Sequence, residues 1–354
     1  MNTLFIFGNG FDLNLGLKTS YRDFYNYYGK NHSAYDSIMR LKKHIGKNKD
    51  VYWSDLEIAL GKYTLDFNTT EDFDEVVDDL RQELSIYLMN MQHHLEKMPL
   101  NKNKFLSDLV YPEKYLTPLE KEIFDKFKKD FLNNQWHFNI VTFNYTNSIE
   151  KILDVIESSK FSEHHSLEGT KKIGNYLNPN IEHIHGFANK RMVLGVNDLS
   201  QVQNKKLHNN IDILEAIIKP QCNSAIGEKS SDNFNSQIDT ADLICVFGMS
   251  FGDSDKIWWE KIGDKLVNSN SRMIIFNKSA DIDPMSIYKA NRVRRKIKNH
   301  FLQQTGLSAE FQKIIDERVF VGVNTHMFKG IRSEKISINH SYNLIDANLK
   351  NMSK

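Results

Sequence analysis

The chain has 354 residues, with 46 Lys and Arg against 45 Asp and Glu, and its formal charge of +1 gives no reason to expect a dedicated nucleic-acid binder. Its 40% apolar content supplies a core for one large domain or two ordinary ones, while two cysteines exclude a disulfide framework and a cysteine-based zinc cluster. We expect a globular cytoplasmic protein, because the sequence shows no secretory signal and no apolar stretch near the ~20 residues that span a bilayer.

Short apolar runs predict the strands of a sheet. Residues 3–7 form the first run, and comparable runs follow at 138–143, 181–186, 242–248 and 272–276. Four of these five runs precede a helical pattern, which is typical of a parallel sheet with crossover helices. Their apolar, β-branched character fits strands covered on both faces. The sequence therefore predicts an α/β fold with a Rossmann-like parallel sheet flanked by helices.

A long helical stretch interrupts this pattern after the first strand. Residues 18–135 repeat apolar side chains at three and four, so we interpret them as an inserted helical module. The α/β domain is then discontinuous, comprising 1–17 and 136–330, and 331–354 form a peripheral C-terminal tail. The acidic stretch 66–83 and the basic stretch Arg292–Lys298 are both interpreted as exposed sides of amphipathic helices, although the second also allows nucleic-acid binding.

The first strand ends in the turn Gly8-Asn9-Gly10-Phe11-Asp12. Two glycines let the backbone approach a ligand closely, and backbone amides at such a turn can hold phosphate. The turn resembles the start of GxGxxG, but Leu13 occupies the third glycine position and no strand ending in an acid follows about 20 residues on. It is either a tight strand-to-helix turn or a nucleotide contact.

Two later strand ends carry candidate catalytic groups. Asn144 follows the second strand, either as a helix cap or as a fixed amide that orients a hydroxyl or a water. In the third strand, period two predicts that His183 and His185 share a face, with Gly186 leaving room beside His185. No Cys or acid stands at zinc-ligand spacing, so we expect no metal. His185 is either a general base, since imidazole titrates near neutral pH, or a structural histidine.

Two further segments complete the candidate site. The loop 249–255 opens a helix, where backbone amides favour phosphate and where Ser250 and an aspartate can bind ribose hydroxyls. Asp253 or Ser254 is alternatively the cap of that helix. Glu57 stands three residues after Ser54, which is the spacing of a capping box, or it is a site residue presented by the insertion.

The segments at these strand ends carry a family resemblance. A glycine-rich turn, TFNYT, HIHG and FGMSFGD occur in the order found in the sirtuin-like NAD-binding fold. More closely, LFIFGNGFDLNLGLKTSYRDF, WSDLEIALG, TFNYTN, HIHG and GMSFGDSD resemble the AbiH family of bacterial phage abortive-infection proteins, over roughly 1–330. The chain departs from sirtuins at Thr146, where an aspartate is missing, and it lacks the four zinc-binding cysteines of protein deacylases.

The resemblance implies cleavage of NAD, as substrate rather than cofactor. It carries the roles of the motif asparagine and histidine over to Asn144 and His185, while Asp12 contacts ribose or a water. The nucleotide would be held chiefly by backbone amides and neutral side chains. The residues expected to bind it are Gly8, Asn9, Gly10, Phe11, Gly248, Ser250, Asp253 and Asp255, with Glu57 and His183 as further candidates.

The resulting hypothesis is an anti-phage effector that hydrolyses NAD or a related nucleotide. One alternative is a sensor that binds a nucleotide without turnover, and another is a nuclease, for which only Arg292–Lys298 gives support. An NAD-consuming toxin must be silent before infection, which implies control by homo-oligomer assembly or by a phage-derived trigger. The sequence names neither.

Overall fold

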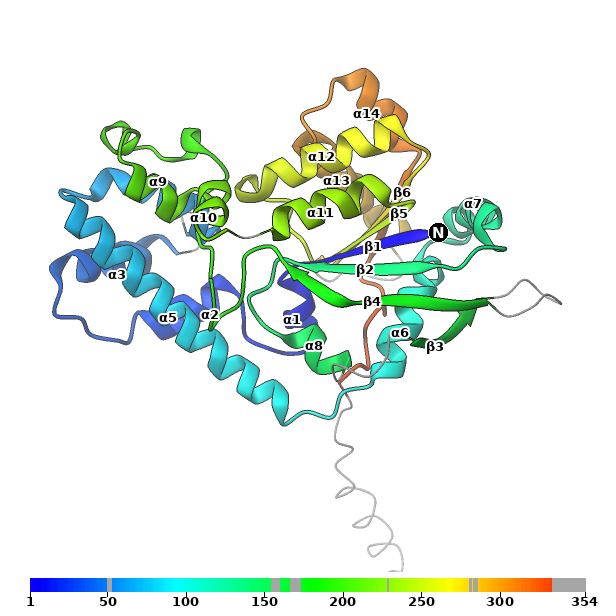
Figure 1. The fold of residues 1–354 in the computed structure, drawn as a ribbon, viewed down its shortest axis with the longest axis horizontal. Coiled ribbons are helices and arrows are strands. Elements are labelled where there is room, and N and C mark those ends of the chain that lie inside the picture. Colours follow the sequence, from blue (N-terminus) through cyan, green and yellow to red (C-terminus); the bar gives the residue numbers. More distant parts are fainter. Residues whose placement is uncertain are drawn as a thin grey trace, which may run out of the picture.

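The structure is a computed structural model that describes residues 1–49, 53–153, 160–165, 173–227, 229–279, 282 and 286–332. Within these residues one seven-stranded sheet forms the centre, with the order β3-β4-β2-β1-β5-β6-β7 (Figure 1). The strands are β1 (Asn2–Phe7), β2 (His137–Thr142), β3 (Lys160–His165), β4 (Ile173–His183), β5 (Leu243–Phe247), β6 (Arg272–Asn277) and β7 (Val319–Val323).

All strands except β3 run parallel to their neighbours, and β3 pairs antiparallel with β4 at one edge. If the six parallel strands are numbered along the chain, their order across the sheet is 3-2-1-4-5-6. This is the order of dinucleotide-binding Rossmann folds, in which the winding direction reverses beside the first strand. The predicted α/β fold with a Rossmann-like parallel sheet is confirmed.

Helices fill the connections between the strands. The helical interpretation of 18–135 is confirmed, since every regular element that the structure describes in this range is a helix. The helices are α1 (Gly10–Asn14), α2 (Tyr21–Tyr28), α3 (Asp36–Asn48), α4 (Leu56–Tyr63), α5 (Thr70–Glu96), α6 (Lys102–Val110), α7 (Pro118–Lys128), α8 (Ser148–Leu153), α9 (Ile211–Ile217), α10 (Lys219–Ala225), α11 (Ser230–Thr240), α12 (Lys256–Asn268), α13 (Ile287–Gln304) and α14 (Ala309–Asp316).

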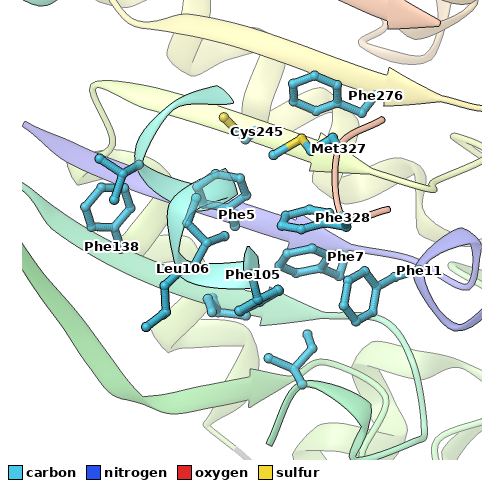
Figure 2. Close-up of a cluster of buried hydrophobic side chains, with 14 of the residues drawn as sticks. Phe5, Phe7, Phe11, Phe105, Leu106, Phe138, Cys245, Phe276, Met327 and Phe328 are labelled. Atoms are coloured by element: carbon cyan, nitrogen blue, oxygen red, sulfur yellow. The ribbon is translucent and has the colours of Figure 1, made fainter. Parts of the chain in front are cut away.

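Alternating side chains of the strands bury both faces of the sheet. On one face, Phe5 and Phe7 of β1 pack with α6, α7 and α8 and with Phe11 and Phe328 (Figure 2). On the other face, Leu4 and Ile6 pack with α11, α12, α13 and α14. Because successive residues of a strand point to opposite faces, one apolar run serves both layers. The expectation of strands covered on both faces is therefore confirmed.

A third apolar cluster lies beyond the carboxyl ends of the strands. It joins α2, α3, α4 and α5 to α9 and to Ile218 just before α10 (Figure 1), around buried side chains such as Trp53, Leu60 and Ile217. The helices α6 and α7, although they belong to the same insertion, pack on the sheet instead. Residues 18–135 therefore contribute to two cores, and the division into domains stays a prediction.

The third predicted strand, 181–186, differs from the structure. Strand β4 starts earlier, at Ile173, and ends at His183. Gly186 has a φ of +70° in the turn that follows, and a Cβ there would lie 1.9 Å from Arg191 O, so the chain leaves the sheet at this point. Two strands were missed: β3, a polar edge strand, and β7, a short run next to a helical pattern.

The two charged stretches are helical, as predicted. Most of 66–83 lies in α5, which buries Phe73, Val77 and Leu80 on one side. In α13 the apolar side is weaker than expected, because only Phe301 and Leu302 are buried and Ile287 is exposed. Of the tail, Ile331 is buried in the core beside the sheet and Arg332 is exposed, while 333–354 lie outside the described residues.

Two glycine substitutions test how closely the first turn is packed. A Cβ on Gly10 would lie 2.5 Å from Gly248 Cα, whereas a Cβ on Gly46, in the exposed part of α3, meets no atom within 4 Å. We expect Gly10→Ala to lower the free energy of unfolding by about 1–3 kcal/mol or more, because backbone must move. Gly46→Ala should raise it by about 0.5–1 kcal/mol. Denaturant unfolding measures both, and equal effects would contradict this account of the turn.

Candidate functional site

A large cavity opens at the carboxyl ends of the parallel strands, with a volume of about 1940 Å³. Residues that follow β1, β2, β4, β5, β6 and β7 all line it, together with residues from the α1–α2 loop, α4 and α5. Ligands of open parallel sheets bind at this edge, where the strand order reverses. Most of the predicted site residues line the cavity: Gly8, Asn9, Gly10, Asp12, Glu57, Asn144, His185, Gly248, Ser250 and Asp255.

Three predicted residues are not brought to the cavity lining. The Phe11 ring packs in the core, 4.8 Å from the Phe7 ring. Asp253 is exposed, and its Oδ1 accepts a 2.9 Å hydrogen bond from Gln304 Nε2. His183 is buried and binds Glu150, with 2.7 Å between Nε2 and Oε1. The prediction that both histidines share one strand face is wrong, because β4 ends at His183.

The glycine turn is joined to the loop after β5. Gly8 N donates to Phe247 O and Gly10 N donates to Gly248 O, each over 3.0 Å. The Asn9 side chain also has protein partners, since its amide donates to Thr19 O and its oxygen accepts from Thr19 Oγ1. The expectation that these two glycine amides hold phosphate is therefore corrected: both line the cavity, but their N–H groups already bind the neighbouring loop.

Asp12 is a buried carboxylic acid at the edge of this cavity. Its Oδ2 accepts a 2.6 Å hydrogen bond from Thr146 Oγ1. Burial raises the pKa of Asp12 to about 6, and hydrogen bonds from Thr146, Ser148 and Asn144 partly offset the rise. A carboxyl group that titrates near neutral pH in a cavity is suited to proton transfer.

Two hydrogen bonds fix the backbone of Asn144. Its N–H donates to Thr142 Oγ1 over 3.1 Å, and its carbonyl accepts from His183 Nδ1 over 3.0 Å. The helix-cap alternative is wrong, because α8 begins only at Ser148. The side-chain amide is thereby free of a capping role, and it interacts with the Asp12 carboxyl inside the cavity.

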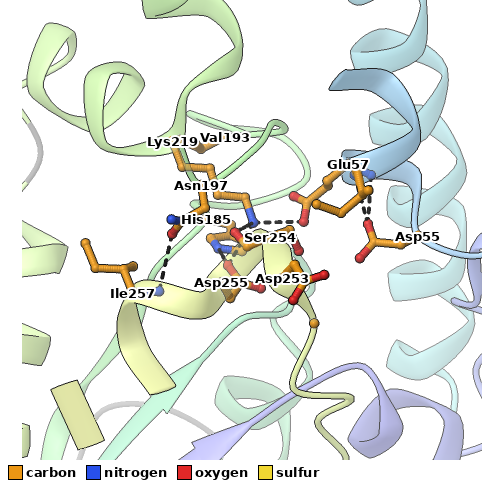
Figure 3. A network of polar contacts seen from close by, with 12 residues as sticks. Asp55, Glu57, His185, Val193, Asn197, Lys219, Asp253, Ser254, Asp255 and Ile257 are labelled. Carbon is orange, nitrogen blue, oxygen red and sulfur yellow. Dashed lines mark hydrogen bonds and ion pairs between the residues drawn. The ribbon is translucent and has the colours of Figure 1, made fainter. Parts of the chain in front are cut away.

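His185 belongs to a buried network of charged side chains (Figure 3). Its Nε2 lies 3.0 Å from Asp255 Oδ1, in the loop that opens α12. The same oxygen lies 2.8 Å from Lys219 Nζ, and Lys219 Nζ lies 2.8 Å from Glu57 Oε2. Glu57 therefore reaches His185 through two intermediate side chains.

The capping-box interpretation of Glu57 is wrong. Helix α4 begins at Leu56, and its N-cap is Asp55 rather than Ser54. Asp55 Oδ1 accepts from the backbone N–H groups of Glu57 and Ile58, over 3.0 and 3.1 Å. The Glu57 side chain is consequently available to the buried network.

The network perturbs the ionisation of its members in different directions. Burial raises the pKa of Glu57, although Lys219 opposes the rise. Burial would also raise the pKa of Asp255, but Lys219 and His185 hold it well below its usual range. Burial disfavours the Lys219 ammonium, yet Asp255 and Glu57 raise the pKa of Lys219 above its ordinary value. Lys219 and Asp255 are therefore charged at neutral pH.

Sequence reasoning missed Lys219 and the basic side of the cavity. Lys219 has no local motif, and only the fold brings it to Glu57. The sequence also led us to expect chiefly neutral side chains around a phosphate, and it did not indicate the four basic side chains that line the cavity: Lys97, Lys278, Lys329 and Arg332. They come from segments near the end of α5, after β6 and after β7.

Two features are absent from the described part of the chain. Among those residues, no group of three or more His, Cys, Asp or Glu side chains is placed to hold a metal ion. None of the helices there combines the length and the apolar character that crossing a membrane requires.

Comparison with known proteins identifies a family for this chain. Residues 4–277, more than half of the chain, match the family model described as Bacteriophage abortive infection AbiH. This range includes Asp12, Glu57, Asn144, His185 and Asp255. No curated protein matches the sequence. The chain therefore belongs to the AbiH family, whose description is bacteriophage abortive infection.

Proposed function

We propose that this protein acts in abortive infection by hydrolysing the N-glycosidic bond of NAD or a related nucleotide. One observation carries the proposal: Asp12, Asn144 and His185, from three separate strand ends, line a single cavity at the point where the sheet reverses its winding. Such crevices bind dinucleotides in Rossmann folds. The three side chains supply a carboxyl group, an amide and an imidazole, which are groups that can transfer protons and orient water.

The dimensions and charge of the cavity favour a nucleotide ligand. Its volume of about 1940 Å³ exceeds the roughly 300–1,000 Å³ of ordinary small-molecule pockets. Lys97, Lys278, Lys329 and Arg332 line it, and ammonium and guanidinium groups are favourable partners for phosphates. We infer that the pyrophosphate contacts this basic side, while the sugar to be cleaved lies toward Asp12 and Asn144.

The proposed reaction separates the base from the sugar. The C–N bond breaks, its electron pair leaves with neutral nicotinamide, and positive charge develops on the ribose ring. A water oxygen then bonds to the anomeric carbon and gives up a proton. The Asp12 carboxylate stabilises the cationic sugar and accepts that proton, while Asn144 orients the water. His185, held by Asp255, contacts a ribose hydroxyl and fixes the sugar.

A panel of nucleotides incubated with the purified protein and analysed by mass spectrometry tests this proposal. We expect the wild type to convert one nucleotide into a free base and the matching ribose product. His185→Ala should be slower on the order of 10²-fold or more, whereas His32→Ala, which changes an exposed histidine, should match the wild type. Circular dichroism of each variant checks that it is folded.

The panel also separates this proposal from the sensor alternative. Each reaction is repeated with extract from phage-infected cells, so that a trigger is present. If a nucleotide binds but its amount stays constant under both conditions, the hydrolase proposal fails and a sensor is favoured.

A further inference from the structure

Three parts of the fold that lie far apart in the sequence meet at His185. Glu57 lies in the first turn of α4, Lys219 is the first residue of α10, and Asp255 directly precedes α12 (Figure 3). His185, Glu57 and Asp255 line the cavity, whereas Lys219 does not. The ammonium group therefore lies behind the residues that face a ligand.

All the hydrogen-bonding capacity of Lys219 is used inside the protein. Its Nζ lies 2.8 Å from Glu57 Oε2, 2.8 Å from Asp255 Oδ1 and 3.1 Å from Ser254 O. An ammonium group has three N–H donors, so these three acceptors satisfy it completely. Lys219 is 6% exposed. Its position is thus suited to fixing other side chains rather than to binding a substrate.

Two carboxyl groups surround one ammonium group in this network. Glu57 and Asp255 each lie 2.8 Å from Lys219 Nζ, so when both are ionised the three side chains carry one net negative charge in a buried place. The His185 imidazole lies against this charge, with 3.0 Å between its Nε2 and Asp255 Oδ1. Tyr145 also faces His185, with 6.0 Å between ring centroids, and Asp55 interacts with Glu57 and Asp255.

We propose that Lys219 is a positioning residue that fixes Asp255 against His185 and, together with Glu57, sets the charge that the His185 imidazole experiences. The ammonium offsets part of the negative charge of the two carboxyl groups beside His185, so its removal leaves the imidazole in a more negative environment. The role in catalysis rests on the proposed hydrolase function, but the effect on His185 belongs to the free protein. Removal of the ammonium and removal of one carboxylate should therefore shift the pH at which His185 gains its proton in opposite directions.

The test is an NMR titration of the histidine side chains in the full chain without nucleotide. The chain has 13 histidines, so His185→Gln identifies the His185 signal. In Lys219→Met, the pH at which His185 gains its proton should rise by about one unit or more, because a nearby positive charge is lost. In Glu57→Gln it should fall, because a nearby negative charge is lost. The double variant Lys219→Met/Glu57→Gln should return it toward the wild-type value.

A second buried ion pair provides the matched control. Lys128 Nζ lies 2.9 Å from Glu113 Oε1, and both side chains are as buried as the Lys219–Glu57 pair. Lys128→Met should destabilise the fold and leave the His185 titration unchanged. If Lys219→Met does not fold, the fall in Glu57→Gln and the reversal in the double variant decide the question.

The two possible failures are distinguishable. An unchanged His185 titration in the Lys219 and Glu57 variants would overturn the positioning role, whatever the nucleotide panel shows. Shifts of the expected sign in a protein that consumes no nucleotide would uphold the positioning role and reject only the hydrolase function. With activity present, Lys219→Met should move the pH–rate profile in the same direction as the NMR titration.

Discussion

Asp12→Asn should lower turnover on the order of 10²-fold or more and should also make the folded protein more stable at neutral pH. Burial raises the pKa of Asp12 to about 6, from an ordinary value of 3.8. The folded state thus keeps this proton to higher pH than the unfolded state does. The contribution of Asp12 to the free energy of unfolding therefore falls as the pH rises from about 4 to about 6, and is constant above that.

Asparagine has the same shape and no charge, and its oxygen can still accept from Thr146 Oγ1. The variant should therefore gain on the order of 1–3 kcal/mol of unfolding free energy at pH 7, and should lose the pH dependence between pH 4 and pH 6. Urea unfolding at pH 4 and at pH 7 measures this effect beside the activity assay. Asp253→Asn, an exposed aspartate outside the cavity lining, is the control and should change neither quantity substantially.

An Asp12→Asn variant that keeps wild-type turnover would remove Asp12 from the reaction. A variant that is inactive but also less stable than the wild type would contradict the account of its burial, because the loss of activity would then follow from misfolding.

Asn144→Ala should slow turnover on the order of 10²-fold and also move the acidic limb of the pH–rate profile to higher pH. The Asn144 side chain is one of the groups that lower the pKa of Asp12, so its removal lets that pKa rise further above its ordinary value. The Asp12 carboxylate then forms only at higher pH, so activity also begins at a higher pH than in the wild type.

A full pH–rate profile of Asn144→Ala measures this shift. Ser224→Ala, at an exposed position in α10 away from the cavity lining, provides a control whose profile should overlay that of the wild type. An Asn144→Ala profile that is lower at every pH but unshifted would show that Asn144 acts on the substrate alone and not on Asp12.

The sequence was sufficient for the α/β class and for the edge of the sheet that carries the site. Apolar runs followed by polar turns mark the strand ends, so Gly8, Asn144 and His185 could be grouped before their positions were known. The strand boundary near His183 could not be predicted in the same way. The residues up to Ile184 keep a strand-like pattern, and only the contact of Gly186 with Arg191 shows where the chain turns.

Contacts between distant residues were beyond local patterns. Glu57 and Lys219 are separated by 162 positions, and neither carries a signal that names the other. The capping-box spacing at Ser54 pointed to a local role for Glu57, but the competing acceptor Asp55 caps the helix instead. The amides of Gly8 and Gly10 illustrate the same limit, since their partners lie after β5.

The cavity draws on Gly8 near the start of the chain, on Asn144 in the middle, and on Asp255 and Asn324 toward its end. A ribosome synthesises these segments in that order. A chain that has been synthesised only as far as Asn144 therefore has the glycine turn, but it lacks Asp255 and the strands β5, β6 and β7 that complete the sheet. If the protein consumes a nucleotide that the cell needs, translation of the segments before β7 would not expose the cell to that activity, because the cavity lining is complete only once the chain has been made through Arg332.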